Sequence, residues 1–203
     1  MSDKKISMII STCVPLSNEN VDTDQIIPAR FLKVTTREGF GENLFRDWRY
    51  NADGTKKDFV LNDPQFSGKI FVAGKNFGCG SSREHAAWAL YDAGFRAVIS
   101  SFYGDIFKSN ALNNFLLPIV VSQPFLDKLL KLVQKAPKTQ VKIDLAHQTV
   151  AVIGHAMKET FEINEYKKIC IMKGYDDIDY MLSHQEKIED FEKTRKHDFS
   201  ITY

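Results

Sequence analysis

The sequence predicts an α/β layered domain with a mixed sheet and a helical C-terminal tail. Short apolar runs alternate with segments whose apolar residues recur at helical spacing, which is typical of strands followed by helices. Two further runs, within 141–153, alternate in hydrophobicity around a short polar stretch and predict a hairpin. We expect residues 1–203 to form a single domain, with 164–203 as a helical extension.

The first 121 residues contain four apolar runs that we expect to be strands: Ile6–Ile10, Lys69–Ala73, Ala97–Ser101 and Leu117–Val121. Helices are predicted between the later strands, at Ser82–Ala93 and Gly104–Phe115. The polar segment Asn51–Thr55 predicts a turn, since Asn, Asp and Gly favour turn conformations.

The last third of the chain begins with a predicted helix, Phe125–Lys135, in which Leu126, Leu129, Leu130 and Val133 recur at helical spacing. The hairpin follows, and then three further elements are expected: a strand at Phe161–Ile163, a charged helical tail from Asn164 with a break at Gly174, and a peripheral helix at Gln185–Lys196.

The segment Ala73–Leu90 is the most informative part of the chain: A-G-K-N-F-G-C-G-S-S-R-E-H-A-A-W-A-L. It leaves a predicted strand, passes three glycines and is expected to open a helix at Ser81 or Ser82. Glycine permits positive φ and close backbone approach, and a helix N-terminus offers free N–H groups and a positive dipole end. With Arg83 in the same turn, the pattern predicts an anion site.

The common phosphate-binding motifs do not fit this turn. Lys75 precedes the loop, whereas a P-loop requires its lysine after the second glycine. Arg83 occupies the place of the third glycine of a dinucleotide fingerprint. A planar guanidinium suits a carboxylate, so we favour a small organic acid. The competing interpretation is a plain capping box, with Ser81 as N-cap and Glu84 reaching back.

Three other residues near this turn have both a functional and a structural interpretation. Cys79 could be an activated thiol, but it has no C-x-x-C partner and we interpret it as a small residue in a tight turn. His85 could orient Ser81 or a ligand, or be a partly buried structural residue. Asp22 and Asp24 precede an apolar run, where an Asx-turn or a helix cap is expected.

Composition excludes several classes of function. A net charge of +1 with scattered basic residues gives no nucleic-acid or membrane surface. No apolar run approaches the roughly 20 residues of a membrane helix. Three dispersed cysteines, Cys13, Cys79 and Cys170, indicate a reducing compartment, and we expect a cytoplasmic protein. They cannot be assumed to hold a cluster, and we expect no metal or cofactor on this chain.

The segment Gly78–Ala86, G-C-G-S-S-R-E-H-A, resembles the swivelling domain of the aconitase superfamily. Val21–Leu32 resembles that superfamily's T-D-x-I segment, and Ser100–Phe107, continuing through Asn110 and Asn114 to Pro118, resembles a third block in the same order. The chain length and Leu44–Tyr50 are similar to the bacterial family of isopropylmalate dehydratase small subunits. The resemblance covers roughly Cys13 to Met181.

The resemblance implies a layered β/β/α swivelling domain and a hydro-lyase that isomerises 2- and 3-isopropylmalate in leucine biosynthesis. It implies Ser81 as the base, acting as an alkoxide, and Ser82, Arg83 and Asp24 as ligands of a small dicarboxylate substrate. The family uses a [4Fe–4S] cluster, which the resemblance assigns to the isopropylmalate dehydratase large subunit as partner of this chain. We assign Asp22 a structural role and no part in ligand binding.

Alternatives remain open for the substrate and for the class of function. Apolar residues between Phe31 and Phe45 suit an isopropyl group, but homoaconitase-type or citraconate/dimethylmaleate-type hydro-lyases share the same motifs. A non-catalytic carboxylate-binding module could use the same turn. Arg30 and Arg37 could complete an anion pocket and are given no firm role.

Overall fold

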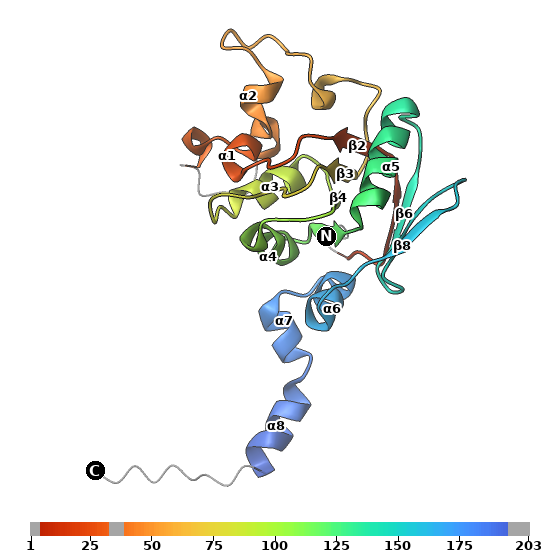
Figure 1. The fold of residues 1–203 in the computed structure, drawn as a ribbon. Helices are drawn as coiled ribbons and strands as arrows, with labels where there is room; N and C mark the ends of the chain where they lie inside the picture. Colours follow the sequence, from red (N-terminus) through yellow and green to blue (C-terminus); the bar gives the residue numbers. More distant parts are fainter. Residues whose placement is uncertain (1–4, 33–38, 195–203) are drawn as a thin grey trace.

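The computed structural model describes residues 5–32 and 39–194. In these residues, eight strands form two sheets (Figure 1). A parallel sheet has the order β2-β3-β4-β5 and comprises β2 (Cys13–Leu16), β3 (Ile70–Ala73), β4 (Ala97–Ser100) and β5 (Leu117–Val120). An antiparallel sheet has the order β1-β6-β7-β8 and comprises β1 (Met8–Ser11), β6 (Val141–Asp144), β7 (Thr149–Val152) and β8 (Met157–Thr160). The α/β class is confirmed, and the two strand directions occupy separate sheets instead of one mixed sheet.

The parallel sheet is covered on both faces, which is why its strands are apolar along their whole length. Successive side chains of a strand point to opposite faces. In β3, Ile70 and Val72 accordingly join one buried cluster, and Phe71 and Ala73 join another. Pro118 is accommodated because β5 is an edge strand, where a missing N–H breaks no ladder.

One face of the parallel sheet packs against the antiparallel sheet and helix α5 (Gln123–Lys135). The helix begins after Ser122, whose hydroxyl accepts from the Phe125 N–H at 3.4 Å. The predicted apolar stripe of α5 is confirmed: Leu126, Leu129, Leu130 and Val133 are all buried. The predicted hairpin is confirmed as β6 and β7, which pair antiparallel.

The other face packs against α1 (Thr23–Ile26), α3 (His85–Asp92) and α4 (Asp105–Asn113). The remaining short elements on this side are α2 (Arg46–Arg49) and 3₁₀ helices at Ala29–Phe31, Gly41–Asn43 and Val60–Asn62. A run of rings crosses this layer, with centroids 5.8 Å apart for Phe45 and Phe71, 5.7 Å for Phe71 and Phe77, and 5.3 Å for Phe77 and Phe107. The loop that follows β3 packs on this row of rings, because Phe77 belongs to both.

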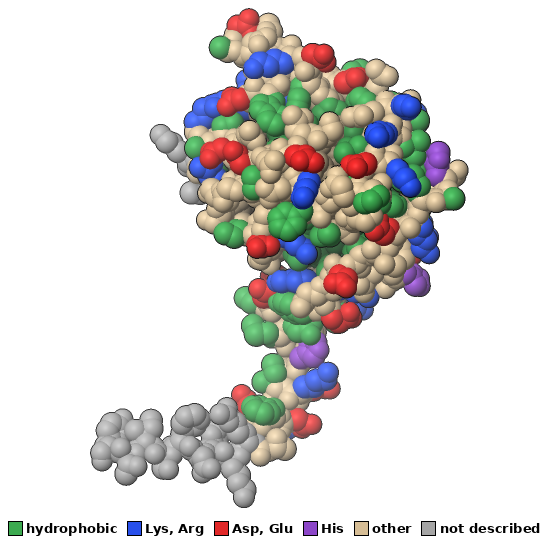
Figure 2. Space-filling view, viewed as in Figure 1, with side chains coloured by type: hydrophobic (Ala, Val, Ile, Leu, Met, Phe, Trp, Pro, Cys, Tyr) green, Lys and Arg blue, Asp and Glu red, His purple; other side chains and the backbone are tan. Residues whose placement is uncertain are grey.

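Three helices follow the second sheet: α6 (Glu165–Lys173), α7 (Asp177–Leu182) and α8 (Gln185–Thr194). The break predicted at Gly174 is confirmed, since that residue ends α6 with φ +72°. Helices α7 and α8 project away from the sheets (Figure 1), and Figure 2 shows hydrophobic side chains along them. Exposed there are Ile178, Met181, Leu182, Ile188 and Phe191. None of the helices within 5–32 and 39–194 is long and apolar enough to cross a bilayer.

Two strand predictions need correction. The expected strand at Phe161–Ile163 is wrong, because the strand is β8, Met157–Thr160, and Phe161 is a core residue beyond its end. The expected first strand is β1, which begins two residues and ends one residue later than predicted, and the chain then crosses at Thr12 into the parallel sheet as β2. The predicted turn at Asn51–Thr55 is confirmed by a 2.9 Å hydrogen bond from the Asn51 N–H to the Thr55 carbonyl.

Candidate active site

The loop between β3 and α3 requires glycine at two positions for different reasons. Gly78 has φ +72°, and a Cβ there would lie 2.2 Å from Cγ of Phe107. Gly74 is needed for close packing alone, because a Cβ would lie 2.3 Å from the Asn18 carbonyl oxygen. The glycines therefore let the loop lie directly on its neighbours and hold it at the carboxyl end of β3, the edge where open α/β sheets bind ligands.

Helix α3 begins later than the sequence pattern predicts. Its first residue is His85, and its N-cap, Glu84, makes no side-chain capping hydrogen bond. A helix opening at Ser81 or Ser82 is therefore wrong, and so is the competing capping box. Glu84 instead accepts a 2.8 Å hydrogen bond from Nδ2 of Asn114. Ser81 lies four residues before the helix, where the helix dipole contributes little because its effect falls off within one turn.

The three segments that carry the family resemblance meet at this loop. The Gly78 N–H donates to the Val21 carbonyl at 2.7 Å, which ties the loop to the segment before α1. The Gly104 N–H donates to the Phe77 carbonyl at 3.0 Å, which ties it to the segment before α4. Residues separated by tens of positions thus form one surface at the same edge of the parallel sheet.

Four polar side chains of the prediction lie on this surface. Ser81 and Ser82 are exposed, so their hydroxyls are open to a ligand. Nη1 of Arg83 forms an ion pair with Oδ1 of Asp24 on α1, and the two side chains are 22% and 53% exposed. The structure therefore brings Asp24 and Arg83 together beside the two serines. The partly buried guanidinium is held in place while its other N–H groups remain able to donate.

Asp22 has the structural role assigned to it. Its carboxylate accepts from the Gln25 N–H at 2.8 Å, and the Gln25 side chain accepts from the Asp22 N–H at 2.9 Å. This capping box begins α1 and so places Asp24, two residues later, against the loop.

Cys79 and His85 have environments that need no chemical role. Burial and the nearby charge of Asp22 raise the pKa of the Cys79 thiol, so it stays protonated at neutral pH and is a poor nucleophile. The His85 ring lies 4.5 Å from that of Trp88 and 5.3 Å from that of Phe40, between centroids. His85 therefore packs among aromatic rings at the start of α3.

Comparisons with known proteins show the family of this chain. Residues 4–124 match the family model described as the aconitase C-terminal domain. A 3-isopropylmalate dehydratase small subunit from Cytophaga hutchinsonii is 62% identical over 195 residues, which is 96% of this chain and 97% of that protein. The chain belongs to the family of 3-isopropylmalate dehydratase small subunits.

Other members of that family extend the likeness. The small subunit from Christiangramia forsetii is 54% identical over 95% of both chains. The crystal structure of 3-isopropylmalate dehydratase (leuD) from Methanocaldococcus jannaschii is 26% identical, with a TM-score of 0.63 over 91% of this chain and 99% of that one. These findings confirm the aconitase-type α/β fold expected from the resemblance.

The cluster used by the aconitase superfamily does not fit the residues of this chain that the structure describes. Cys13 is buried in β2, where burial raises its pKa to about 12, and Cys170 is buried in α6. Cys79 lies in the loop after β3, apart from both, and no set of three or more His, Cys, Asp or Glu side chains in the described part could hold a metal ion. A [4Fe–4S] cluster requires several thiolates in one place.

Of the apolar segment between Phe31 and Phe45 that the sequence suggested for an isopropyl group, Phe31 and Leu32 are half-buried, and residues 33–38 lie outside the described part of the chain. Phe40, Leu44 and Phe45 are buried in the core and unavailable to a ligand. Arg30 is engaged with Asp47, 2.9 Å from Nη1 to Oδ2. Arg37 lies outside the described residues.

Sequence reasoning also missed the residues that hold the turn. Nδ2 of Asn110 donates to the Ser82 carbonyl at 3.3 Å, and the Thr23 hydroxyl donates to the Ser81 carbonyl at 3.3 Å. Asn110 lies in the third resembling block and Thr23 beside Asp24 in the second, which was the available signal.

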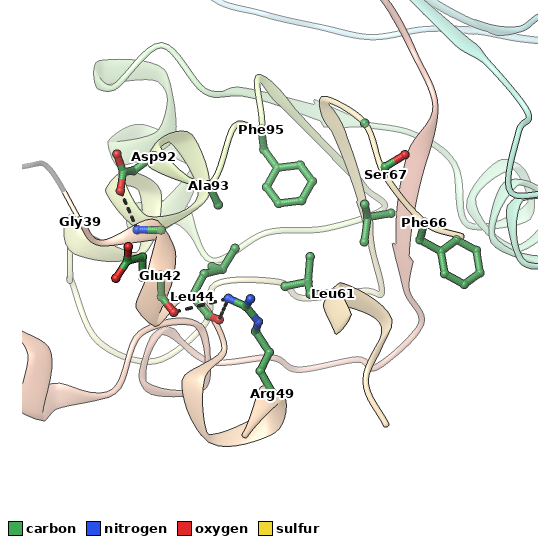
Figure 3. Close-up of a pocket in the computed structure, with 13 residues that line it drawn as sticks. Gly39, Glu42, Leu44, Arg49, Leu61, Phe66, Ser67, Asp92, Ala93 and Phe95 are labelled. Carbon is green, nitrogen blue, oxygen red and sulfur yellow. Dashed lines mark hydrogen bonds between the residues drawn. The ribbon is translucent and has the colours of Figure 1, made fainter. Parts of the chain in front are cut away.

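A cavity of about 630 Å³ lies at the opposite edge of the parallel sheet (Figure 3). Ser67 precedes β3 and Phe95 precedes β4, so the cavity opens at the amino ends of the strands. Figure 3 shows Arg49 directed at the carbonyls of Glu42 and Leu44, with distances of 3.5 and 3.3 Å from Nη1. The Arg49 guanidinium is thus engaged in hydrogen bonds to backbone carbonyls. The residues that line the cavity do not include the Ser81 turn.

Proposed function

We propose that this chain acts as the small subunit of a 3-isopropylmalate dehydratase, a hydro-lyase that interconverts 2- and 3-isopropylmalate in leucine biosynthesis. The single observation that carries the site assignment is the exposed Ser81–Ser82 turn beside the Arg83–Asp24 ion pair. The names of the relatives support the substrate. A hydroxyl and a guanidinium in a loop at a sheet edge suit a small diacid.

Ser81 is the proposed base. Dehydration removes a proton from one carbon while hydroxide leaves its neighbour, and rehydration returns both with their positions exchanged. An ordinary serine hydroxyl is too weak an acid to supply an alkoxide at neutral pH, so its surroundings must stabilise the anion. Because α3 begins only at His85, that stabilisation falls to the loop N–H groups and the Arg83 cation instead of the helix dipole.

Ser82 and Arg83 are the proposed ligands of a substrate carboxylate, and Asp24 is the proposed residue of the binding site that orients Arg83. A guanidinium carries five N–H donors, and the pairing with Asp24 engages Nη1, which leaves donors for a substrate carboxylate. Asp24 cannot itself bind a carboxylate, because like charges repel. Its part is to fix Arg83 in the orientation that meets the substrate, while the Ser82 hydroxyl donates to a carboxylate oxygen.

The partner in this proposal is the large subunit, which carries the [4Fe–4S] cluster that supplies a Lewis acid when present. Among the described residues of this chain, no group of three or more His, Cys, Asp or Glu side chains could hold a metal ion, which supports placing the cluster on the partner. The Ser81 turn is exposed at one edge of the molecule and could be closed over by a partner, which would exclude water. We propose a cytoplasmic, single-domain protein with no nucleic-acid or membrane partner.

The test is reconstitution. The chain is co-purified with a cluster-loaded large subunit and assayed on isopropylmalate, homoaconitate, citraconate and dimethylmaleate, with each subunit alone as control. We expect turnover of isopropylmalate by the pair only. Activity confined to another diacid would contradict the substrate assignment, and binding of diacids without any turnover would favour a non-catalytic module.

A further inference from the structure

Thr23 is a buried polar residue next to the proposed base. Only 1% of its surface is exposed, and burying a hydroxyl is unfavourable unless it finds a hydrogen-bond partner. The Thr23 hydroxyl donates to the Ser81 carbonyl at 3.3 Å, and the Thr23 N–H donates to the Cys79 carbonyl at 3.0 Å. One residue of α1 therefore holds the loop at two points on either side of Gly80.

A second element holds the following peptide. Nδ2 of Asn110 on α4 donates to the Ser82 carbonyl at 3.3 Å. Consecutive carbonyls, of Ser81 and Ser82, are thus bound by side chains of two different helices, α1 and α4. The turn precedes α3, so a helical ladder does not fix the orientation of these peptides. The side chains of Thr23 and Asn110 fix this orientation instead, by donating hydrogen bonds to the two carbonyls.

We propose that Thr23 and Asn110 are positioning residues for the Ser81 hydroxyl. The inference rests on the proposed function, because it assigns them a role in proton transfer by Ser81. A base must lie within hydrogen-bond reach of the proton that it removes, and a shift of about 1 Å can lower a rate roughly 100-fold. The capping box of Asp22 and Gln25 fixes α1, α1 fixes Thr23, and Thr23 fixes the Ser81 peptide.

The first experiment compares Thr23→Val with Thr23→Ser in the reconstituted enzyme. Valine keeps the shape of threonine and removes the hydroxyl, whereas serine keeps the hydroxyl. We expect Thr23→Val to lower kcat by about 10- to 100-fold with little change in KM, and Thr23→Ser to recover most of the rate. Urea unfolding and the affinity for the large subunit serve as controls for a merely structural effect. Wild-type kcat in a folded Thr23→Val enzyme would overturn the inference.

The second experiment places Thr23→Val on a Ser81→Ala background. If Thr23 acts through Ser81, its loss should change the residual rate of Ser81→Ala by less than about twofold. Equal losses on both backgrounds would overturn the inference. Failure of the proposed function has a different signature, because Ser81→Ala alone would then keep its kcat. Should Thr23→Val not fold, Asn110→Ala takes its place in the same cycle with the same expectations, since Asn110 is only half-buried.

Discussion

Gly78→Ala should be the most destabilising glycine-to-alanine change among Gly78, Gly80 and Gly94, and two separate costs can be read from the structure. The backbone φ of +72° costs an alanine about 1–2 kcal/mol. The new Cβ would also lie 2.2 Å from Cγ and 2.6 Å from Cβ of Phe107. That ring is 1% exposed and lies against Phe77, so it cannot swing away, and overpacking of this kind costs about 1–3 kcal/mol.

The other two glycines separate these costs. Gly94 has φ +97° and nothing within 4 Å of the place that an added Cβ would occupy, and Gly80 has φ +88° with its nearest neighbour, Cβ of Asp22, at 3.4 Å. Both should therefore lose only the backbone component, about 1–2 kcal/mol. Gly78→Ala should lose about 2–5 kcal/mol in total, because the overlap adds to the strain.

Urea unfolding of the three alanine variants, analysed by linear extrapolation, measures the differences in the free energy of unfolding. The slope of each transition should stay constant, since none of the changes alters the surface exposed on unfolding. A loss at Gly78 no greater than at Gly94 would refute the close packing of the loop on Phe107. A loss at Gly80 equal to that at Gly78 would show that backbone strain alone explains the glycines.

Three further predictions concern single side chains. Arg83→Lys should raise KM for the diacid about 10- to 100-fold in steady-state kinetics, because a point charge replaces a planar donor worth about 1.5–3 kcal/mol; an unchanged KM would argue against carboxylate binding. Cys79→Ala should keep kcat within about twofold, since its thiol is protonated; a large loss would indicate a chemical role. The His147 N–H and ring lower the pKa of Asp144 from 3.8, so its charge stabilises the fold above that pH and less as pH falls through the lowered pKa. Urea unfolding of wild type and Asp144→Asn should therefore converge in acid, and a constant difference would contradict the pairing.

Local sequence patterns predicted most strands and α5, because burial of one or both faces of an element determines where its apolar residues recur. The division into two sheets could not be predicted from such patterns. β1 and β2 are separated by a single residue, yet β1 pairs with β6 and β2 pairs with β3. Which sheet a four-residue strand joins depends on pairings with segments far away in the sequence.

The sequence pointed to the residues of the candidate site but not to the residues that hold its turn in place. Ser81 to Glu84 fits a capping pattern, but hydrogen bonds from Thr23 and Asn110 hold this segment outside the helix, and those contacts span 58 and 28 residues. The pairing of Asp24 with Arg83 spans 59 residues and was not predicted, since family resemblance suggested only that both residues belong to the site. Asp22, whose partner Gln25 is three residues away, was the one support that local chemistry identified.

The role of Ser81 is tested most directly by kcat and KM of Ser81→Ala in complex with the large subunit. The matched control is Ser67→Ala, an exposed serine at the opposite edge of the parallel sheet. We predict that Ser81→Ala lowers kcat by about 100- to 10,000-fold while KM changes little, and that Ser67→Ala behaves as wild type. A Ser81→Ala enzyme that keeps kcat within a few-fold of wild type would contradict the assignment of this turn as the source of the base.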